Sequence, residues 1–148
     1  MVARSEALDG RFASLARIMG GRFSMRSRLG ILELDAGLLS LRDRSGSSLF
    51  SVPAATVEAH RQRRLSMHPM YFQIRAAEEW WYLCGYGVTK YKRGATRELQ
   101  ERYGLCTLVP RPPRMSVDDY ERITRNAARH QVLWAIFWVE TLNSAGAS

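Results

Sequence analysis

Basic side chains in two short stretches are the residues of this sequence best suited to bind another molecule. Guanidinium and ammonium groups hold phosphate and carboxylate oxygens, and an aromatic ring among them can stack on bases or lie at lipid headgroups. The candidate residues for binding an anion or a partner are Arg61, Arg63, Arg64, Lys90, Tyr91, Lys92 and Arg93. A plain solvated basic face is the alternative that these clusters leave open.

Tryptophans supply candidate apolar contacts on the surface. Trp80 and Trp81 are adjacent in a segment with strand composition, and successive side chains of a strand point to opposite faces, so we expect one ring to face outward. Trp138 lies in the run Val132–Val139, which is apolar on every side of a helix and exceeds what one helix face can bury against a sheet. A helix near the N-terminus, a second subunit or a membrane surface would cover the excess.

Metal binding and catalysis are not indicated by the sequence. The histidines and cysteines do not fall at the spacings of paired metal ligands. Gly85–Lys90 lacks the Gly-Lys-Ser/Thr ending of a phosphate-binding loop, and Ser45–Ser48 lacks the pattern of a nucleophile elbow. The acid pairs Glu78-Glu79 and Asp118-Asp119 fit a turn and a helix start. We therefore expect no enzyme, no metal and no cofactor.

Length, composition and charge describe a single basic domain. The chain has 148 residues, 46% of them hydrophobic and 24% charged, which suits one globular core. Its net charge of +8 favours encounter with nucleic acid, acidic proteins or anionic lipid. Two cysteines are too few for a disulfide framework, and charges interrupt any apolar leader in the first residues. The sequence thus predicts a cytoplasmic protein.

The elements expected in the first half are a helix followed by short strands. Apolar residues at helical spacing predict a short amphipathic helix over Val2–Met19, which Gly20-Gly21 ends. The spacing then changes to alternation, which predicts a hairpin over Gly30–Leu41 with its turn at residues 35–37. Further strands are expected at Leu49–Val52 and Thr56–Ala59.

The second half is expected to end in the clearest helix. A hairpin of Tyr71–Arg75 and Trp80–Tyr86 comes first, followed by an insertion over residues 87–113. Within the insertion, Gly94–Tyr103 could form a helix ended by Gly104, and Leu105–Val109 a strand. Ser116 stands three residues before Asp119 in a variant of the capping box, so we expect an amphipathic helix over about 116–142.

Short strands in hairpins closed by a C-terminal helix resemble the pleckstrin-homology-like (PH-like) superfold. The run Gly30–Leu41, then Leu49–Pro53 and Val57, is similar to small GRAM-like or bacterial PH-like proteins of actinobacteria. The resemblance implies an α+β, mainly β fold, with a barrel of two antiparallel sheets plugged by the C-terminal helix, on which Trp134 or Trp138 would be a core residue. The domains would be an N-terminal helix in residues 1–21 and one PH-like domain in 22–148.

Members of the superfold that bind phosphoinositides resemble one another in carrying basic residues at the first hairpin. The corresponding turn here, Asp35-Ala36-Gly37, presents a carboxylate, which argues against inositol-lipid recognition. Our leading hypothesis is a non-catalytic binding or scaffolding module that recognises a protein or peptide. One alternative is peripheral association with the inner face of an anionic membrane through the basic loops and the N-terminal helix. Nucleic-acid binding is the other, and a homodimer fits any of the three.

Overall fold

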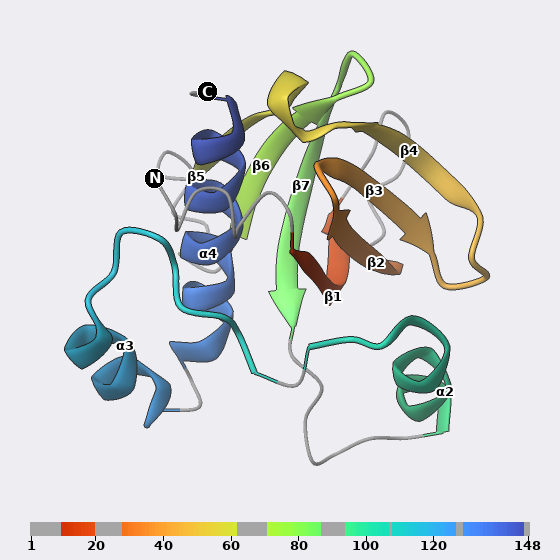
Figure 1. Cartoon of the computed structure of the whole chain (residues 1–148). Helices are drawn as coiled ribbons and strands as arrows, with labels where there is room; N and C mark the ends of the chain where they lie inside the picture. The colour runs from red at the N-terminus through yellow and green to blue at the C-terminus, as the bar shows by residue number, and fades with distance from the viewer. Residues whose placement is uncertain are drawn as a thin grey trace.

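The computed structural model describes residues 10–19, 28–61, 71–86, 94–106, 108–126 and 129–146. These residues form one open antiparallel sheet of seven strands in the order β4-β3-β2-β1-β7-β6-β5, with helices on both of its faces (Figure 1). The elements are β1 (Arg11–Met19), β2 (Arg28–Asp35), β3 (Leu38–Asp43), β4 (Ser48–Pro53), the 3-10 helix η1 (Ala54–Thr56), β5 (Glu58–Arg61), β6 (Tyr71–Ala76), β7 (Glu79–Tyr86), α2 (Gly94–Tyr103), α3 (Val117–Thr124) and α4 (His130–Gly146). The fold is mainly β, as the alternating segments predicted.

β1 is the main departure from the predicted elements. Residues 11–19 form a strand that pairs with β2 on one side and β7 on the other, so the prediction of a helix over Val2–Met19 is wrong for these residues. Residues 1–9 lie outside the described part. Because β1 joins the two groups of strands, they make one sheet where two were predicted.

β1 is buried on both faces, which explains why its sequence does not alternate. Ser14 and Ala16 point to the inner face with α4, while Ala13 and Leu15 belong to a second apolar cluster on the outer face. A strand buried on both sides needs small and apolar residues throughout, and such a run can be read as one face of a helix. The spacing of the apolar residues was therefore ambiguous.

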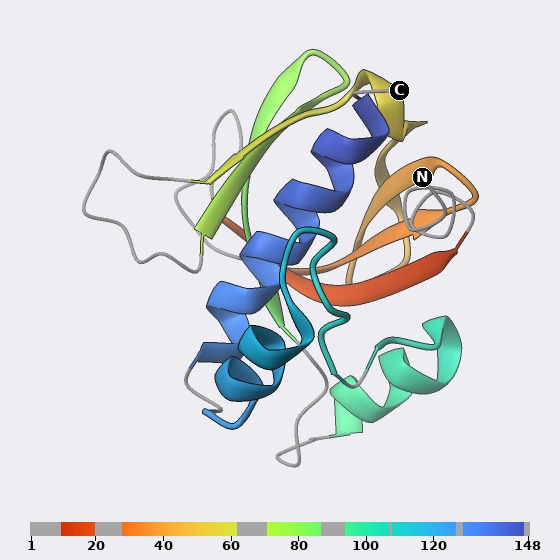
Figure 2. The same cartoon turned by 60° about the vertical axis from the view of Figure 1, so that its left-hand side comes forward.

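α4 fills the inner side of the sheet. The sheet curves around this helix, and α3 lies against the end of α4 where it begins (Figure 2). Both Trp134 and Trp138 are buried, and the indole N–H of Trp138 donates to the hydroxyl of Ser14 on β1 at 3.1 Å. The apolar run Val132–Val139 is covered within the chain, by the sheet, by α3 and by partly buried residues such as Met115.

The predicted C-terminal helix is correct at its start and divided in its middle. The Ser116 hydroxyl accepts a hydrogen bond from the amide of Asp119 at 3.1 Å, which confirms the cap. The helix then stops at Thr124, where tighter turns replace it, with the amide of Asn126 bonded to the carbonyl of Ile123 at 3.1 Å. A second helix, α4, begins at His130. The break lets α3 turn back and pack against α4.

α2 covers the outer face of β1 and β2, and it has the bounds that the sequence predicted. Leu99 and Leu105 pack there against Ala13, Leu15 and Ile31. Gly104 follows the helix with a φ of +60°, a conformation that glycine adopts without strain. No strand forms over the described residues of Leu105–Val109, although the amide of Cys106 donates to the carbonyl of Ala13 at 2.8 Å.

Arg11 fixes the end of α2 to the sheet. Its guanidinium pairs with Glu33 on β2 at 2.5 Å and donates to the carbonyl of Gly104 at 3.2 Å. A cation beside the exposed carbonyls of a helix C-terminus is favourable. The inserted segment is thus attached by both apolar contacts and charge.

The turn between β6 and β7 carries backbone strain. Ala77 and Glu78 have φ values of +52° and +66°, in the left-handed region that costs other residues about 1–2 kcal/mol each. Two-residue hairpin turns of this kind favour Asn-Gly. We predict that the double replacement Ala77→Asn and Glu78→Gly raises the free energy of unfolding by about 1 kcal/mol in urea titrations. Ala55→Gly, at an exposed residue without positive φ, should lower it, and a loss of stability in the double variant would contradict the prediction.

Among the helices of the described residues, none combines the length and apolar character needed to cross a lipid bilayer.

Candidate functional site

β5 is the last strand at one edge of the sheet formed by the described residues, and α4 packs against it. It pairs with β6, and no strand pairs with its other side in the described part of the chain. Glu58, Ala59 and His60 also make no backbone hydrogen bond there outside the ladder with β6. The N–H and C=O groups on the outer side of an edge strand are free to pair with another extended chain. β5 is therefore a candidate binding edge.

A groove lies beside the end of β5, between the strand, α4 and the start of α3. Its volume is about 370 Å³. The residues that line it are Arg61, Arg114, Met115, Asp119, Ile136, Val139 and Glu140. They combine apolar side chains of α4 with charged groups around them, a mixture suited to an apolar anchor with a charged neighbour.

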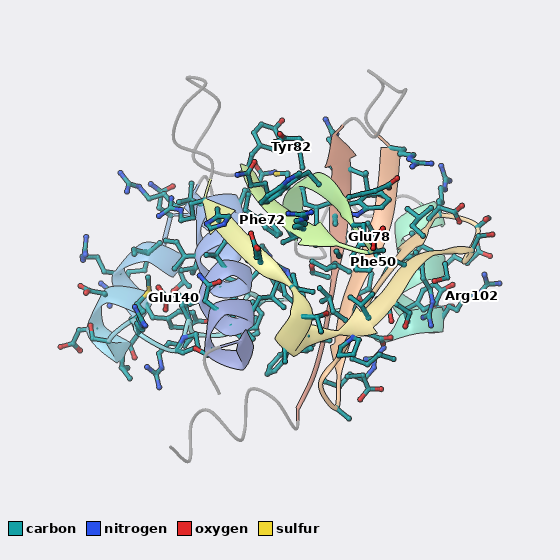
Figure 3. The ribbon with its side chains drawn as sticks, turned by 90° about the horizontal axis from the view of Figure 1, so that it is seen from above. Phe50, Phe72, Glu78, Tyr82, Arg102 and Glu140 are labelled. Carbon is teal, nitrogen blue, oxygen red and sulfur yellow. The ribbon has the colours of Figure 1, made fainter. Side chains whose placement is uncertain are left out.

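The two carboxylates of this groove are already engaged. Glu140, labelled in Figure 3 on α4, accepts a hydrogen bond from the amide of Arg114 at 2.8 Å. A hydrogen bond from the Arg122 guanidinium at 3.1 Å, together with hydrogen bonding to Ser116, holds the pKa of Asp119 below its usual range. By contrast, the guanidinium of Arg114 has no hydrogen-bond or ion-pair partner among the described residues. Within the described lining of this groove, Arg114 is therefore a cation that a ligand could pair with.

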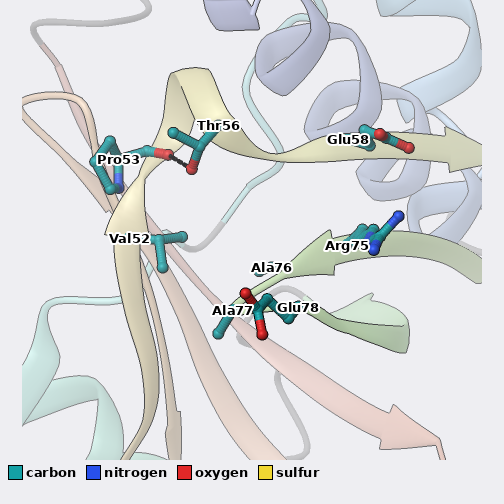
Figure 4. Close-up of a pocket in the computed structure, with 8 residues that line it drawn as sticks. All are labelled: Val52, Pro53, Thr56, Glu58, Arg75, Ala76, Ala77 and Glu78. Carbon is teal, nitrogen blue, oxygen red and sulfur yellow. Dashed lines mark hydrogen bonds between the residues drawn. The ribbon is translucent and has the colours of Figure 1, made fainter.

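A second hollow lies at the beginning of β5. Its volume is about 350 Å³, and it is lined by Val52, Pro53, Thr56, Glu58, Arg75, Ala76, Ala77 and Glu78 (Figure 4). The strained turn between β6 and β7 forms one wall, and the end of β4 forms another. The Thr56 hydroxyl donates to the carbonyl of Pro53 at 2.7 Å and fixes that wall. Glu58 and Arg61 bound the strand, so the two hollows lie at its two ends, about 10 Å apart along the chain.

One residue of the predicted basic clusters lies at this edge. Arg61 ends β5 and lines the groove. The remaining candidates lie outside the described residues; they are Arg63, Arg64, Lys90, Tyr91, Lys92 and Arg93. β5 and β7 are both antiparallel to β6, so the chain leaves Arg61 and Tyr86 at the same end of the sheet. Both basic stretches of the sequence therefore follow strands that end at the same end of the sheet.

The tryptophan candidates separate into one exposed ring and two buried ones. Trp80 faces outward and is 40% exposed. Trp81, the other candidate of this pair, is the ring that faces inward and is not an exposed contact. It packs 5.4 Å from the ring of Phe50 and donates to the carbonyl of Ala76 at 3.2 Å. The prediction that Trp138 is an exposed contact is wrong, because α4 places this side chain in the core against Ser14.

The sequence did not single out Arg114, Ile136 or the rest of the groove beyond Arg61. These residues come together only because α3 folds back on α4, and neither the proline-rich segment before Ser116 nor the uniformly apolar α4 marks one of its faces for contact. Within the described ranges, no three His, Cys, Asp or Glu side chains gather closely enough to hold a metal ion.

Comparison with protein families, with curated proteins and with solved structures finds nothing that matches this chain.

Proposed function

We propose that this chain is a non-catalytic module that binds an extended peptide along the free edge of β5. The observation that carries the proposal is an edge strand that has no second strand partner among the described residues and has a hollow at each end. Backbone hydrogen bonds to the edge would supply affinity, and the hollows would select side chains. The PH-like resemblance supports this role, because a bent sheet closed by a C-terminal helix leaves the strand beside that helix as an edge.

The groove favours a peptide that places an apolar side chain beside an acidic one. Ile136 and Val139 offer an apolar floor, and Arg114 offers a guanidinium without a partner in the described part of the chain. A carboxylate held by such a group makes a charge-assisted hydrogen bond. The net charge of +8 also speeds the approach of an acidic partner.

The competing membrane hypothesis loses one of its two supports. It relied on an amphipathic helix over Val2–Met19, and residues 11–19 are a strand in the middle of the sheet. Cys84 and Cys106 form no disulfide among the described residues, which fits a reducing compartment. We therefore propose that the protein meets the peptide in the cytoplasm.

The test is selection of binding peptides from a displayed library of random octapeptides, followed by fluorescence anisotropy with the labelled peptides. We expect the variant Ile136→Glu to weaken binding at least tenfold, because it puts a carboxylate on the apolar floor of the groove. We expect Arg114→Ala to weaken acidic peptides about fivefold, on the order of 1 kcal/mol, and to leave their Gln-substituted analogues unchanged. Amide NMR shifts should change along β5.

Arg125→Ala is the matched control, since Arg125 is an exposed arginine at the C-terminal end of α3 and does not line the groove. It should bind like the parent protein. Selected peptides whose affinity is the same for the Ile136→Glu variant, or whose NMR shifts avoid β5, would show that the edge is not the site. A library that yields no specific binder also counts against the proposal.

A further inference from the structure

The outer face of β5, β6 and β7 is built from two rows of side chains. Figure 3 shows Tyr82 and the buried Phe72 on opposite sides of their strands, so the side chains of the outer rows alternate with buried ones. The rows lie about 7 Å apart, because they are two residues apart along each strand. From β5 to β7, the first row is Glu58, Arg75 and Trp80, and the second row is His60, Gln73 and Tyr82.

Aromatic rings are the exposed apolar groups of this face. Trp80 and Tyr82 are 40% and 39% exposed. The ring centroids of Trp80 and His60 are 6.0 Å apart although β6 separates their strands, so the indole leans over β6. α2 does not reach these rings, because it packs on Leu15, whose neighbour on β7 is Tyr86, two rows beyond Tyr82. Aromatic residues are enriched in protein interfaces, so this uncovered face is suited to contact another protein.

The charge of the face changes sign along the strands. At the end with the turn between β6 and β7, the carboxylates of Glu58, Glu78 and Glu79 outnumber the guanidinium of Arg75. Beyond Tyr82, the next outward row holds the exposed Arg17 on β1, which is level with Cys84 of β7. A uniformly charged ligand would match only one end of this face. A partner with the opposite order of charges along its length matches both ends.

A second copy of the chain has this opposite order when a two-fold axis crosses the strands between the two rows. The axis exchanges the rows, and it brings the basic end of each copy to the acidic turn of the other. An axis along the strands is unfavourable, because it would put Arg75 against Arg75. Across the favourable axis, the facing side chains are Trp80 with Tyr82, Arg75 with Gln73, and Glu58 with His60, each pair occurring twice.

We propose that two copies of this chain associate through the outer faces of β5–β7 in this two-fold arrangement. The two sheets would pack face to face, about 10 Å apart. Three strands span only about 15 Å, which makes the interface small, so we expect a dissociation constant of about 10–100 µM. The dimer does not rest on the peptide proposal, because its test contains no peptide and the groove with Arg114 and Ile136 lies against α4.

The experiment is sedimentation velocity of the full chain from about 5 to 500 µM, which spans the expected dissociation constant. Trp80→Ala should weaken the dimer at least tenfold, because it removes a central aromatic contact twice. Gln73→Glu should strengthen the dimer severalfold, since it puts a carboxylate opposite Arg75 of the second copy. Gln73→Lys should weaken it, since it puts an ammonium there. Opposite effects at one residue require the two-fold register, and non-specific association would not produce them.

Leu38→Ala is the matched control, because Leu38 is an apolar residue of similar exposure, 45%, on the distant strand β3. It should dimerise like the parent, and near-ultraviolet circular dichroism checks that each variant keeps its core. The proposal is overturned by a parent protein that is monomeric at about 500 µM, by a dimer that Trp80→Ala does not weaken, or by equal effects of the two Gln73 variants. A monomer whose Trp80 and Tyr82 amide signals shift with a selected library peptide would assign this face to a peptide instead.

Discussion

Replacing Trp134 with alanine should lower the free energy of unfolding by about 3–5 kcal/mol. The side chain is 1% exposed, packs 5.8 Å from the ring of Phe137 and 6.4 Å from that of Trp138, and fills the inside of the curved sheet. Removing it leaves a cavity that the surrounding strands, held in one sheet, can close only in part. A domain of ordinary stability, about 5–15 kcal/mol, would be left close to unfolding.

Urea titrations monitored by circular dichroism measure this loss, and Trp80→Ala provides the comparison. It deletes the same side chain from the outer face, where the ring is exposed, so the change should stay within about 0.5 kcal/mol. Equal losses in the two variants would mean that α4 does not form the centre of the core.

The replacement Gly85→Ala should cost about 1–3 kcal/mol, although it adds only a methyl group. A Cβ atom at Gly85 would lie 2.9 Å from the Cβ of Trp134 and 3.3 Å from its Cγ. These atoms are close to the backbone of α4, so the clash cannot be relieved by rotating a flexible side-chain end. The helix itself would have to move away from β7.

Gly37→Asn is the companion measurement, again by urea titration. Gly37 has a φ of +82°, and a Cβ atom added there would meet no other atom within 4 Å. Its requirement is therefore conformational, and asparagine tolerates that region better than other residues. We expect a loss clearly smaller than that of Gly85→Ala. If Gly85→Ala leaves stability unchanged, the close approach of α4 to β7 is incorrect.

Much of the fold could be predicted from local patterns where one face of an element meets solvent. The turn at residues 35–37 marks the hairpin of β2 and β3, and Ser116 and Gly104 mark a helix start and a helix end with side-chain and backbone chemistry. β1 was misread because α2 and α4 bury both of its faces, and no pattern within residues 11–19 announces two covering helices. The conformation of residues 11–19 is therefore set by contacts with distant parts of the chain and not by the local sequence.

The candidate site was less accessible from sequence for a related reason. The alternation at Trp80-Trp81 correctly predicted one outward ring, yet it could not say which, since the inward direction depends on where α4 lies. The groove with Arg114 and Ile136 joins residues from separate helices and a strand. Such a site exists only after α3 has packed on α4, so neither composition nor spacing predicts it.

The central place of β1 has a consequence for how the chain is made. β1 is the first described strand to leave the ribosome, but one of its two hydrogen-bonding neighbours, β7, and the helices that cover its faces, α2 and α4, are synthesised much later. Contacts between distant parts of a chain form slowly and must wait for both parts. During synthesis, β1 therefore lacks β7 as a pairing partner and keeps its apolar residues uncovered until α4 has been translated.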